Sequence, residues 1–529
     1  LIGAALMFGL LLAAIPFLAS ALGRLTRALS LLVGLAGSVL NAFVLLGDYP
    51  AVHLLIAWFS AALIAEGIAG LLPAPKLARA PRRVLLGAMV LSSLAAVVLP
   101  PSPAVLGRLY SLPSSVLPPF LAQLYPDQPG PSLELVHPRY LASPWFQGRE
   151  QLPAVPPTRA LVLPKPRSVV LLTVDALRAD VVIKPEYLQR FPGFATLRKN
   201  CAYFLQARTA ASSTRASLAT MFTGRLHSQI NYDLKRFEHR GPMLAELLTS
   251  AGVKTVSVPH EKRIRAAAGV GRGFATEIKD DLRVAGIIDK VMELIGPTET
   301  SFVFAHIGEP HAPYKGEGPR FERYLQEVGR VDKELLRLFE FLKESGRAKN
   351  TLLIVTADHG EGFGEHGVNY HSRIIYEEVA RVPLVLCGPG IAGRDISQMV
   401  SLIDMAPTIL DAFELPAPGT YMGQSLLGLA MGAKVSLERP IAINATRGLD
   451  GLYLHDGKKV IIDIHGKSVE VYDVNKDPGE LENLVASPDP AVLSAIETTR
   501  LFFHQHRAAL AREFPPSEAE AEALAQERD

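Results

Sequence analysis

The stretch that indicates the fold most clearly reads SVVLLTVDALRAD and runs from Ser168 to Asp180. Its residues 169–174 form a short, continuous apolar run, as expected for a strand that is buried on both faces. Asp175 follows this run directly. A carboxylate held at the end of a buried strand is a natural cation ligand, and a turn or cap residue is the alternative. The stretch therefore predicts an α/β domain with a polar residue at one edge of its sheet.

Similar apolar runs recur along the chain, and segments with helical periodicity separate them. This alternation is typical of a mostly parallel sheet with helices on both faces. In such a sheet the active site gathers at the carboxyl ends of the strands. We expect strands at 253–258, 301–306, 351–356 and 384–386 and helices at 241–251 and 321–344.

The pattern changes near the C-terminus, where short strand-like segments follow one another without long helices between them. Segments 451–456, 458–464 and 469–473 predict a small antiparallel sheet. A closing helix is expected at 490–512.

The composition excludes several classes of protein. Of 529 residues, 49% are hydrophobic and 20% are charged, and the formal net charge is +2. Because no broad basic face is indicated, nucleic acid is not expected as a partner. Cys201 and Cys387 are too few for a disulfide framework or a four-cysteine zinc site. We interpret them as two separate buried residues, and a disulfide between them in an extracytoplasmic domain is the alternative.

The apolar excess is concentrated in residues 1–100. Runs in this region approach or reach the ~20 apolar residues that a helix needs to cross a ~30 Å hydrocarbon core. Basic residues follow the first and third runs, so the positive-inside rule places the rest of the chain outside. We therefore expect a multi-pass protein of the cell membrane with an extracytoplasmic catalytic domain, periplasmic or extracellular. The apolar runs cover 1–22, 31–46, 51–72 and 84–99.

These patterns divide the chain into parts. Prolines are frequent after the apolar runs and disfavour long regular elements there, so this region is interpreted as a tether. Because the chain begins with Leu1 and is apolar from there, we also expect further sequence before it. The expected parts are a transmembrane region of about four helices at 1–100, a proline-rich linker at 101–166, a catalytic core at 167–445, a C-terminal subdomain and helix at 446–512, and an acidic tail at 513–529.

Further chemistry-bearing residues follow other predicted strands. Asp358 and His359 end the strand at 351–356 and offer one oxygen and one nitrogen ligand. Thr214 lies in a run of small hydroxyl residues ahead of a predicted helix. Such residues are most often N-caps, but a hydroxyl beside a metal and a helix N-terminus is also an activated nucleophile.

Histidines complete the set of polar clusters. His306 ends the strand predicted at 301–306, His311 follows it, and His371 lies beyond Asp358. Such histidines bind a tetrahedral anion or protonate a leaving group, although a lone histidine is more often structural. Several clusters at predicted strand ends of one domain favour an active site.

Together these segments resemble the sulfatase family within the alkaline phosphatase superfamily. The resemblance covers about 168–484 and is specific because the motifs occur as an ordered set. It implies an alkaline-phosphatase-like fold with a small C-terminal antiparallel subdomain. The motifs are VDALRAD at 174–180, TRASL at 214–218 with TGR at 223–225, EPHAPY at 309–314, DHGEGFGEHG at 358–367, VEVYD at 469–473 and DPGEL at 477–481.

The resemblance also implies roles for individual residues. Thr214 occupies the family's nucleophile position, and His311 and His371 match histidines that contact the transferred group or the leaving oxygen. A divalent ion is implied, Mn²⁺, Zn²⁺ or Ca²⁺, with a second ion conceivable at ligands such as Glu309 and His371. The implied metal ligands are Asp175, Thr214, Asp358 and His359, and the substrate-binding candidates are His306, Arg215 and Glu309.

Two departures from the family pattern bear on the substrate. Sulfatases that use formylglycine need Cys or Ser followed by Pro two residues later and Arg four residues later, but Thr214 is followed by Ala216 and Leu218. Ala176 stands where a second aspartate is common, which makes a calcium-rich site less expected.

A threonine nucleophile behind membrane helices is similar to phosphoethanolamine transferases and lipoteichoic-acid synthases. The sequence therefore favours cleavage or transfer of a phosphate ester, less so of a sulfate ester, from a membrane lipid or a phosphorylated or sulfated glycan. One alternative is a sulfuric ester hydrolase that acts on sulfated glycans. A second is an inactive, membrane-tethered binding domain.

Overall fold

The computed structural model describes Leu32 and residues 131–146, 152–165, 167–230, 241–260, 264–437, 439–445, 448–464 and 468–513. Apart from Leu32, the four apolar runs that predict membrane helices lie outside these residues. Within the described ranges, no helix is both long enough and apolar enough to cross a membrane. The acidic tail also lies outside the described residues, except for Glu513.

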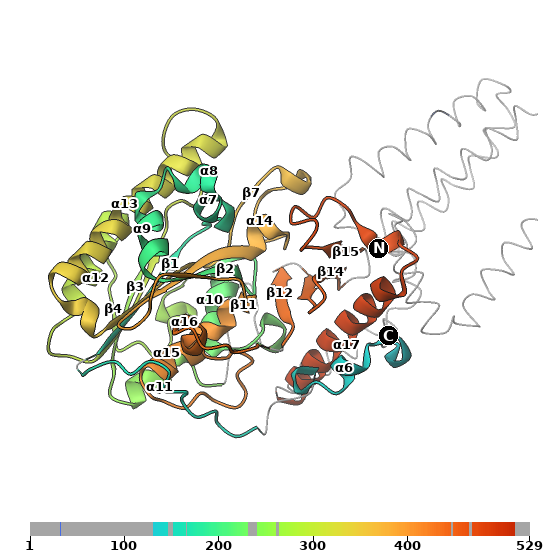
Figure 1. Cartoon of the computed structure of the whole chain (residues 1–529), viewed down its shortest axis with the longest axis horizontal. Helices are drawn as coiled ribbons and strands as arrows, with labels where there is room; N and C mark the ends of the chain where they lie inside the picture. The colour runs from blue at the N-terminus through green and yellow to red at the C-terminus, as the bar shows by residue number, and fades with distance from the viewer. Residues whose placement is uncertain are drawn as a thin grey trace, which may run out of the picture. The chain divides into compact units, whose positions relative to one another are not determined.

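A nine-stranded sheet forms the centre of the described domain, in the order β10-β2-β9-β6-β1-β5-β3-β4, with β11 paired to β2 (Figure 1). The strands predicted at its centre are confirmed. They are β1 (Ser168–Val174), β3 (Lys254–Pro259), β5 (Ser301–Ile307) and β6 (Thr351–Ala357). All seven residues of β1 are buried because it lies between two parallel neighbours and under helices on both faces. Its register pairs Val174 with Ile307 and with Ala357, so these three strands end side by side.

The other half of the sheet contains an antiparallel strand, β9 (Arg381–Cys387), which pairs with both β6 and β2 (Ala202–Arg208). The sheet is therefore mixed rather than uniformly parallel, and β2 was not predicted from the sequence. Three short strands complete it: β4 (Thr276–Glu277), β10 (Arg394–Ile396) and β11 (Val400–Ser401).

A disulfide joins Cys201 and Cys387, whose Cα atoms lie 4.7 Å apart. The preferred interpretation of two separate buried cysteines was therefore wrong. The two residues meet because they flank Ala202 and Leu386, which are paired across β2 and β9. This pairing depends on the antiparallel course of β9, which the sequence pattern did not indicate.

Helices cover both faces of the sheet (Figure 1). One face carries α9 (Pro192–Asn200), α12 (Val284–Leu294) and α13 (Arg320–Glu344). The other carries α10 (Thr214–Thr223), α11 (Leu244–Ser250), α15 (Met405–Ala412) and α16 (Leu427–Ala430). The helix predicted at 321–344 is confirmed, because Val328, Val331 and Leu335 recur at helical spacing and are buried.

A second sheet, antiparallel and four-stranded, forms the C-terminal subdomain together with α17 (Pro490–Glu513). Its strands are β12 (Ile441–Ala445), β13 (Leu449–Tyr453), β14 (Lys458–Asp463) and β15 (Val469–Asp473). The last three and the closing helix were predicted, whereas β12 was not.

Part of the proline-rich region packs against this subdomain. It forms η1 (Leu133–Leu135), α6 (Pro138–Leu141) and η2 (Pro144–Phe146). The ring centroids of Phe146 and Phe502 lie 5.1 Å apart, so this segment is anchored on α17. The remaining short elements are α7 (Ala179–Ile183), α8 (Pro185–Leu188), η3 (His227–Gln229), η5 (Ala266–Ala268), η6 (Arg347–Lys349), β7 (Gly362–Phe363), η7 (Glu365–Gly367), β8 (Asn369–Tyr370), α14 (Glu377–Ala380), η8 (Leu402–Asp404) and η9 (Leu484–Ala486).

Candidate metal and ester-cleavage site

Three buried residues meet where β1, β5 and β6 end. Asp175 follows β1, Asp358 follows β6, and His306 is the next-to-last residue of β5. Each offers a ligand atom, and these atoms all lie within 4.8 Å of one another. Because Val174 and Ala357 are paired in the sheet, the two aspartates that follow them are brought together by strand register alone.

The orientation of His306 is set by its neighbour in β1. Thr173 Oγ1 and His306 Nδ1 lie 2.8 Å apart in a hydrogen bond. The other ring nitrogen, Nε2, then lies 3.5 Å from Asp175 Oδ2. The sequence suggested His306 as a substrate-binding residue, and the structure places it with the two carboxylates, where its imidazole is a candidate metal ligand.

The chemistry of this cluster fits a divalent cation. Asp175 Oδ1 and Asp358 Oδ2 are buried and have no hydrogen-bond partner among the residues that the structure describes. Burial raises the pKa of Asp358 to about 7, and the nearby charge of Asp175 adds to this effect. Burial also acts to raise the pKa of Asp175, but the hydrogen bond to His306 and the charges of the neighbouring histidines together outweigh it, and the net pKa is lowered. Two carboxylates and an imidazole in a buried space form a donor set suited to Mn²⁺ or Zn²⁺.

A second imidazole faces the same space. His359 Nε2 lies 3.4 Å from Asp358 Oδ2 and 3.7 Å from Asp175 Oδ1. Its Nδ1 lies 2.9 Å from the carbonyl oxygen of Gly360, which assigns the ring proton to Nδ1 and leaves the Nε2 lone pair available. Burial holds the pKa of His359 well below its ordinary value. A neutral imidazole with this orientation can complete the ligand set.

Thr214 lies beside this cluster at the first position of α10, directly after the N-cap residue Ser213. Its Oγ1 lies 3.3 Å from His359 Nε2. A helix N-terminus carries partial positive charge, which favours a hydroxyl that develops negative charge. The structure therefore brings the predicted nucleophile to the predicted metal ligands.

The loop before Thr214 is held by hydrogen bonds to two different parts of the domain. The backbone N–H of Asn444 in β12 donates to Ala210 O at 3.0 Å, and Ser212 N–H donates to Asn444 O at 3.1 Å. On the other side, Ser217 Oγ of α10 donates to Asp358 O at 2.7 Å. The C-terminal sheet and the loop after β6 thus fix the position of Thr214 together.

His311 and His371 lie at the same site. The ring centroid of His371 is 4.1 Å from that of His359 and 5.2 Å from that of His311. Its Nδ1 is hydrogen-bonded to Glu361 Oε1 at 2.9 Å. Burial by itself would lower the pKa of His371. The hydrogen bond and the negative charge of Glu361 act in the opposite direction and leave the pKa of His371 raised overall. This arrangement favours a protonated imidazole that can donate to an oxygen.

Two predicted site residues have other surroundings. Glu309 Oε1 lies 2.7 Å from Arg283 Nε, and this ion pair rather than a histidine engages its carboxylate. Arg215 follows Thr214 in the first turn of α10 and is partly buried. A second metal site built on Glu309 and His371 has no support in these contacts, because His371 pairs with Glu361.

Sequence reasoning assigned no role to Glu361 or Thr173. Glu361 is fully buried and accepts a hydrogen bond from Tyr314 Oη at 2.6 Å in addition to its contact with His371. The signal that the sequence offered was an acid two residues after a predicted ligand pair, and its burial, which calls for a partner, is known only from the structure. Thr173 gave no such signal, since it reads as one more residue of a buried strand.

The fold and the site define a class of protein. Residues 167–415, just under half of the chain, match the sulfatase family. Among curated proteins, Delta 4,5-hexuronate-2-O-sulfatase of Bacteroides thetaiotaomicron is 26% identical over 169 residues, which is 30% of this chain and 35% of that protein. Arylsulfatase K of Bos taurus is 31% identical over 188 residues, 33% of this chain and 34% of that protein.

The curated relatives are matched over about a third of their length. A solved structure shares more of the fold: phosphonate monoester hydrolase of Agrobacterium radiobacter superposes with a TM-score of 0.54 at 17% identity. That likeness covers 66% of this chain and 96% of that one. It confirms the predicted α/β architecture with its C-terminal antiparallel sheet.

Proposed function

We propose that this protein is a metal-dependent hydrolase that cleaves a sulfate ester on a glycan, with Thr214 as the nucleophile. The observation that carries the proposal is the position of Thr214 Oγ1, at the start of α10 and 3.3 Å from His359 Nε2. Relatives named as sulfatases support a sulfate ester over the phosphate ester that the sequence favoured. The similarity to sulfatases therefore supports the proposed substrate class, and the position of Thr214 in this chain supports the proposed nucleophile.

In this proposal the residues of the site have separate roles. Asp175, Asp358 and His306 would hold a divalent cation, with His359 able to complete the set, and the cation would neutralise charge that develops on the transferred group. Thr214 Oγ1 would form a bond to sulfur as the bond from sulfur to the sugar oxygen breaks. His371 would donate the proton that this oxygen takes up, and the proton that the hydroxyl of Thr214 loses would pass to a water molecule at the site. Water would then release sulfate and restore the hydroxyl of Thr214.

Cleavage of a phosphate or phosphonate ester is the second candidate, and Thr214 itself favours it. A threonine cannot become the formylglycine aldehyde, and the required Pro and Arg are replaced by Ala216 and Leu218. A hydroxyl that attacks phosphorus needs no such modification. Transfer to an acceptor hydroxyl instead of water, as in enzymes that use lipid-linked donors, belongs to this second candidate.

The location of the enzyme is also a proposal. We infer an extracytoplasmic catalytic domain attached to a membrane through the apolar runs of residues 1–99. The disulfide between Cys201 and Cys387 supports this location, because disulfides persist mainly in oxidising compartments. A membrane-linked lipid or glycan would then be held near the site at a high effective concentration.

The test is a comparison of substrates on the full chain loaded with Mn²⁺ or Zn²⁺. An aryl sulfate, an aryl phosphate monoester and an aryl phosphonate monoester would be assayed side by side, with Thr214→Val as the blank. Faster turnover of the sulfate ester, lost in Thr214→Val, supports the proposal. Faster turnover of a phosphorus ester supports the second candidate, and no turnover of any ester would indicate a binding protein.

A further inference from the structure

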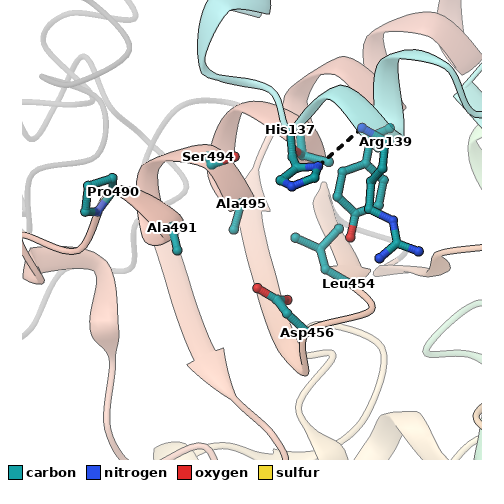
Figure 2. Close-up of a pocket in the computed structure, with 10 residues that line it drawn as sticks. His137, Arg139, Leu454, Asp456, Pro490, Ala491, Ser494 and Ala495 are labelled. Atoms are coloured by element: carbon teal, nitrogen blue, oxygen red, sulfur yellow. Dashed lines mark hydrogen bonds between the residues drawn. The ribbon is translucent and has the colours of Figure 1, made fainter.

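A cavity of about 410 Å³ opens in the C-terminal subdomain, away from the ends of β1, β5 and β6. Figure 2 shows its walls: residues of α6 face residues of α17 across the opening, and Leu454 and Asp456 close it from the hairpin between β13 and β14. This volume lies within the ~300–1,000 Å³ that is usual for small-molecule sites. No residue of the candidate active site lines it.

Two basic side chains line this cavity: Arg139 of α6 and His137, the residue that precedes and caps this helix. The guanidinium of Arg139 lies 5.7 Å from the ring centroid of Tyr140 and makes no hydrogen bond or ion pair with any described residue. His137 Nδ1 accepts a hydrogen bond from the backbone N–H of Arg139 at 3.2 Å. This contact assigns the proton of the neutral ring to Nε2, which is therefore a donor as well. Such a pair suits an anionic group, which guanidinium binds in a bidentate way.

A buried hydroxyl on α17 gives a second, independent indication of a ligand. Thr498 lines the cavity and is 0% exposed, yet its Oγ1 has no hydrogen-bond partner in the described part of the chain. The next residue, Thr499, satisfies its hydroxyl by donating to Ala495 O at 2.9 Å. A buried hydroxyl left without a partner is costly, and a polar ligand in the cavity would remove that cost.

The other groups that line the cavity favour a sugar over an inorganic anion as its ligand. Asp456 presents a carboxylate, but Lys458 Nζ lies 2.6 Å from its Oδ2 and offsets its charge. Ser494 adds a hydroxyl from α17. A carboxylate and a hydroxyl are good partners for ring hydroxyls, whereas inorganic sulfate or phosphate would leave the carboxylate as a source of repulsion.

We propose that this cavity is a second, non-catalytic site that binds an anionic sugar. Arg139 and His137 hold the sulfate or phosphate group of the sugar. Asp456, Ser494 and Thr498 hold its ring hydroxyls. The inference deepens the proposed function, on which it rests for its substrate class, because an enzyme that acts on sulfated glycans would use such a site to bind a second unit of the same chain.

The experiment measures binding rather than turnover, on the full chain carrying Thr214→Val. The probes are N-acetylglucosamine 6-sulfate, neutral N-acetylglucosamine and inorganic sulfate. Calorimetry measures the affinity of each probe, and hydrogen–deuterium exchange locates its binding site. We expect the sulfated sugar to protect 137–141, 454–456 and 490–498 from exchange, and the other two probes to protect them much less. Arg139→Ala should weaken this binding by roughly tenfold, and Thr498→Val by roughly threefold.

The matched control is Arg190→Ala, which removes an exposed arginine that pairs with Glu322 far from the cavity in sequence and leaves α6 intact. It should leave the protection unchanged. Absence of protection in these three segments with the sulfated sugar would overturn the inference, as would equal protection by inorganic sulfate alone. Failure of the proposed function would be seen in a different measurement, as absence of ester turnover. Sugar binding at the cavity and ester turnover at the candidate active site can each be lost without the other.

Discussion

At the scale of single residues, the proposed function depends most on the hydroxyl of Thr214. Thr214→Val keeps the shape of the side chain and removes the nucleophile, so we expect turnover to fall by about 10³-fold or more. Thr214→Ser keeps a hydroxyl at the start of α10 and should retain measurable turnover. Steady-state rates of the two purified variants, with thermal unfolding as a check on folding, make the comparison. Equal loss in both variants would show that shape rather than the hydroxyl matters.

His366 provides a prediction on pH and stability. Its Nδ1 lies 3.0 Å from Glu378 Oε1, and its ring stacks on Tyr376 with centroids 3.7 Å apart. Burial acts to lower the pKa of His366, but the hydrogen bond and charge of Glu378 and the contacts with Glu480 together outweigh it, so the net pKa lies above its ordinary value. A histidine with a raised folded-state pKa stabilises the fold below the unfolded pKa, and this stabilisation is lost as pH rises through the folded pKa.

His366→Gln should therefore reduce the free energy of unfolding by roughly 1 kcal/mol near pH 5.5 and by much less near pH 8.5. Urea unfolding at the two pH values measures the difference. A cost that is the same at both values would mean that the ring acts through packing on Tyr376 and not through its charge.

The sequence predicted the residues at the centre of the candidate site but not the residues that position them. Asp175 and Asp358 could be predicted because both end buried strands, and parallel strands end at one edge. Glu361 could not be paired with His371 in advance, because their contact depends on the course of the loop between them. The ion pair between Glu309 and Arg283 could not be predicted either, because nothing in the motif around Glu309 points to that arginine.

At the scale of elements, the loop after β6 must approach α14 closely. A Cβ added to Gly360 would lie 2.0 Å from the carbonyl oxygen of Glu378, which is backbone and cannot move aside. Gly360→Ala should thus lower the free energy of unfolding by about 1–3 kcal/mol and reduce turnover by displacing the Asp358 and His359 pair. The control is Gly296→Ala, because nothing lies within 4 Å of its added Cβ. Similar behaviour of the two variants in thermal unfolding and turnover would contradict this account.

The second prediction at this scale concerns the disulfide that joins the ends of β2 and β9. Cys201 and Cys387 are 186 residues apart in sequence, so the disulfide restricts the unfolded chain over a long loop. Reduction should lower the free energy of unfolding by about 2–5 kcal/mol. The variant Cys201→Ala with Cys387→Ala should be less stable from the start and insensitive to reductant. Unfolding curves with and without reductant decide the matter, and an unchanged midpoint in the native protein would contradict the bond.

The sheet also shows why strand order was harder to predict than strand position. An apolar run predicts a buried strand in either direction, so the antiparallel course of β9 left no mark on the pattern. β2 was missed because its sequence, AYFLQAR, ends in polar residues. Arg208 is buried there only because Glu377 lies 2.7 Å away in the folded chain, a partner that a local pattern does not reveal.

At the scale of the whole molecule, the described domain depends on contacts between distant parts of the chain. Asn444 of the C-terminal sheet holds the loop before Thr214, and Phe146 of the proline-rich region packs on α17. The sequence predicted both the α/β core and the C-terminal sheet, because each follows from local periodicity. It did not predict that the C-terminal sheet contacts the loop before Thr214, since that contact joins segments more than 200 residues apart.

The central claim is that a divalent ion bound by these carboxylates and histidines serves the hydroxyl of Thr214. The most direct test measures metal content and ester turnover together in the purified full chain and in Asp175→Asn and Asp358→Asn. We predict that the native chain binds a divalent ion, that each substitution removes the ion and the turnover together, and that chelation followed by Mn²⁺ or Zn²⁺ restores turnover only in the native chain. Full turnover of the metal-free native chain, or retention of the ion in both variants, would contradict the account.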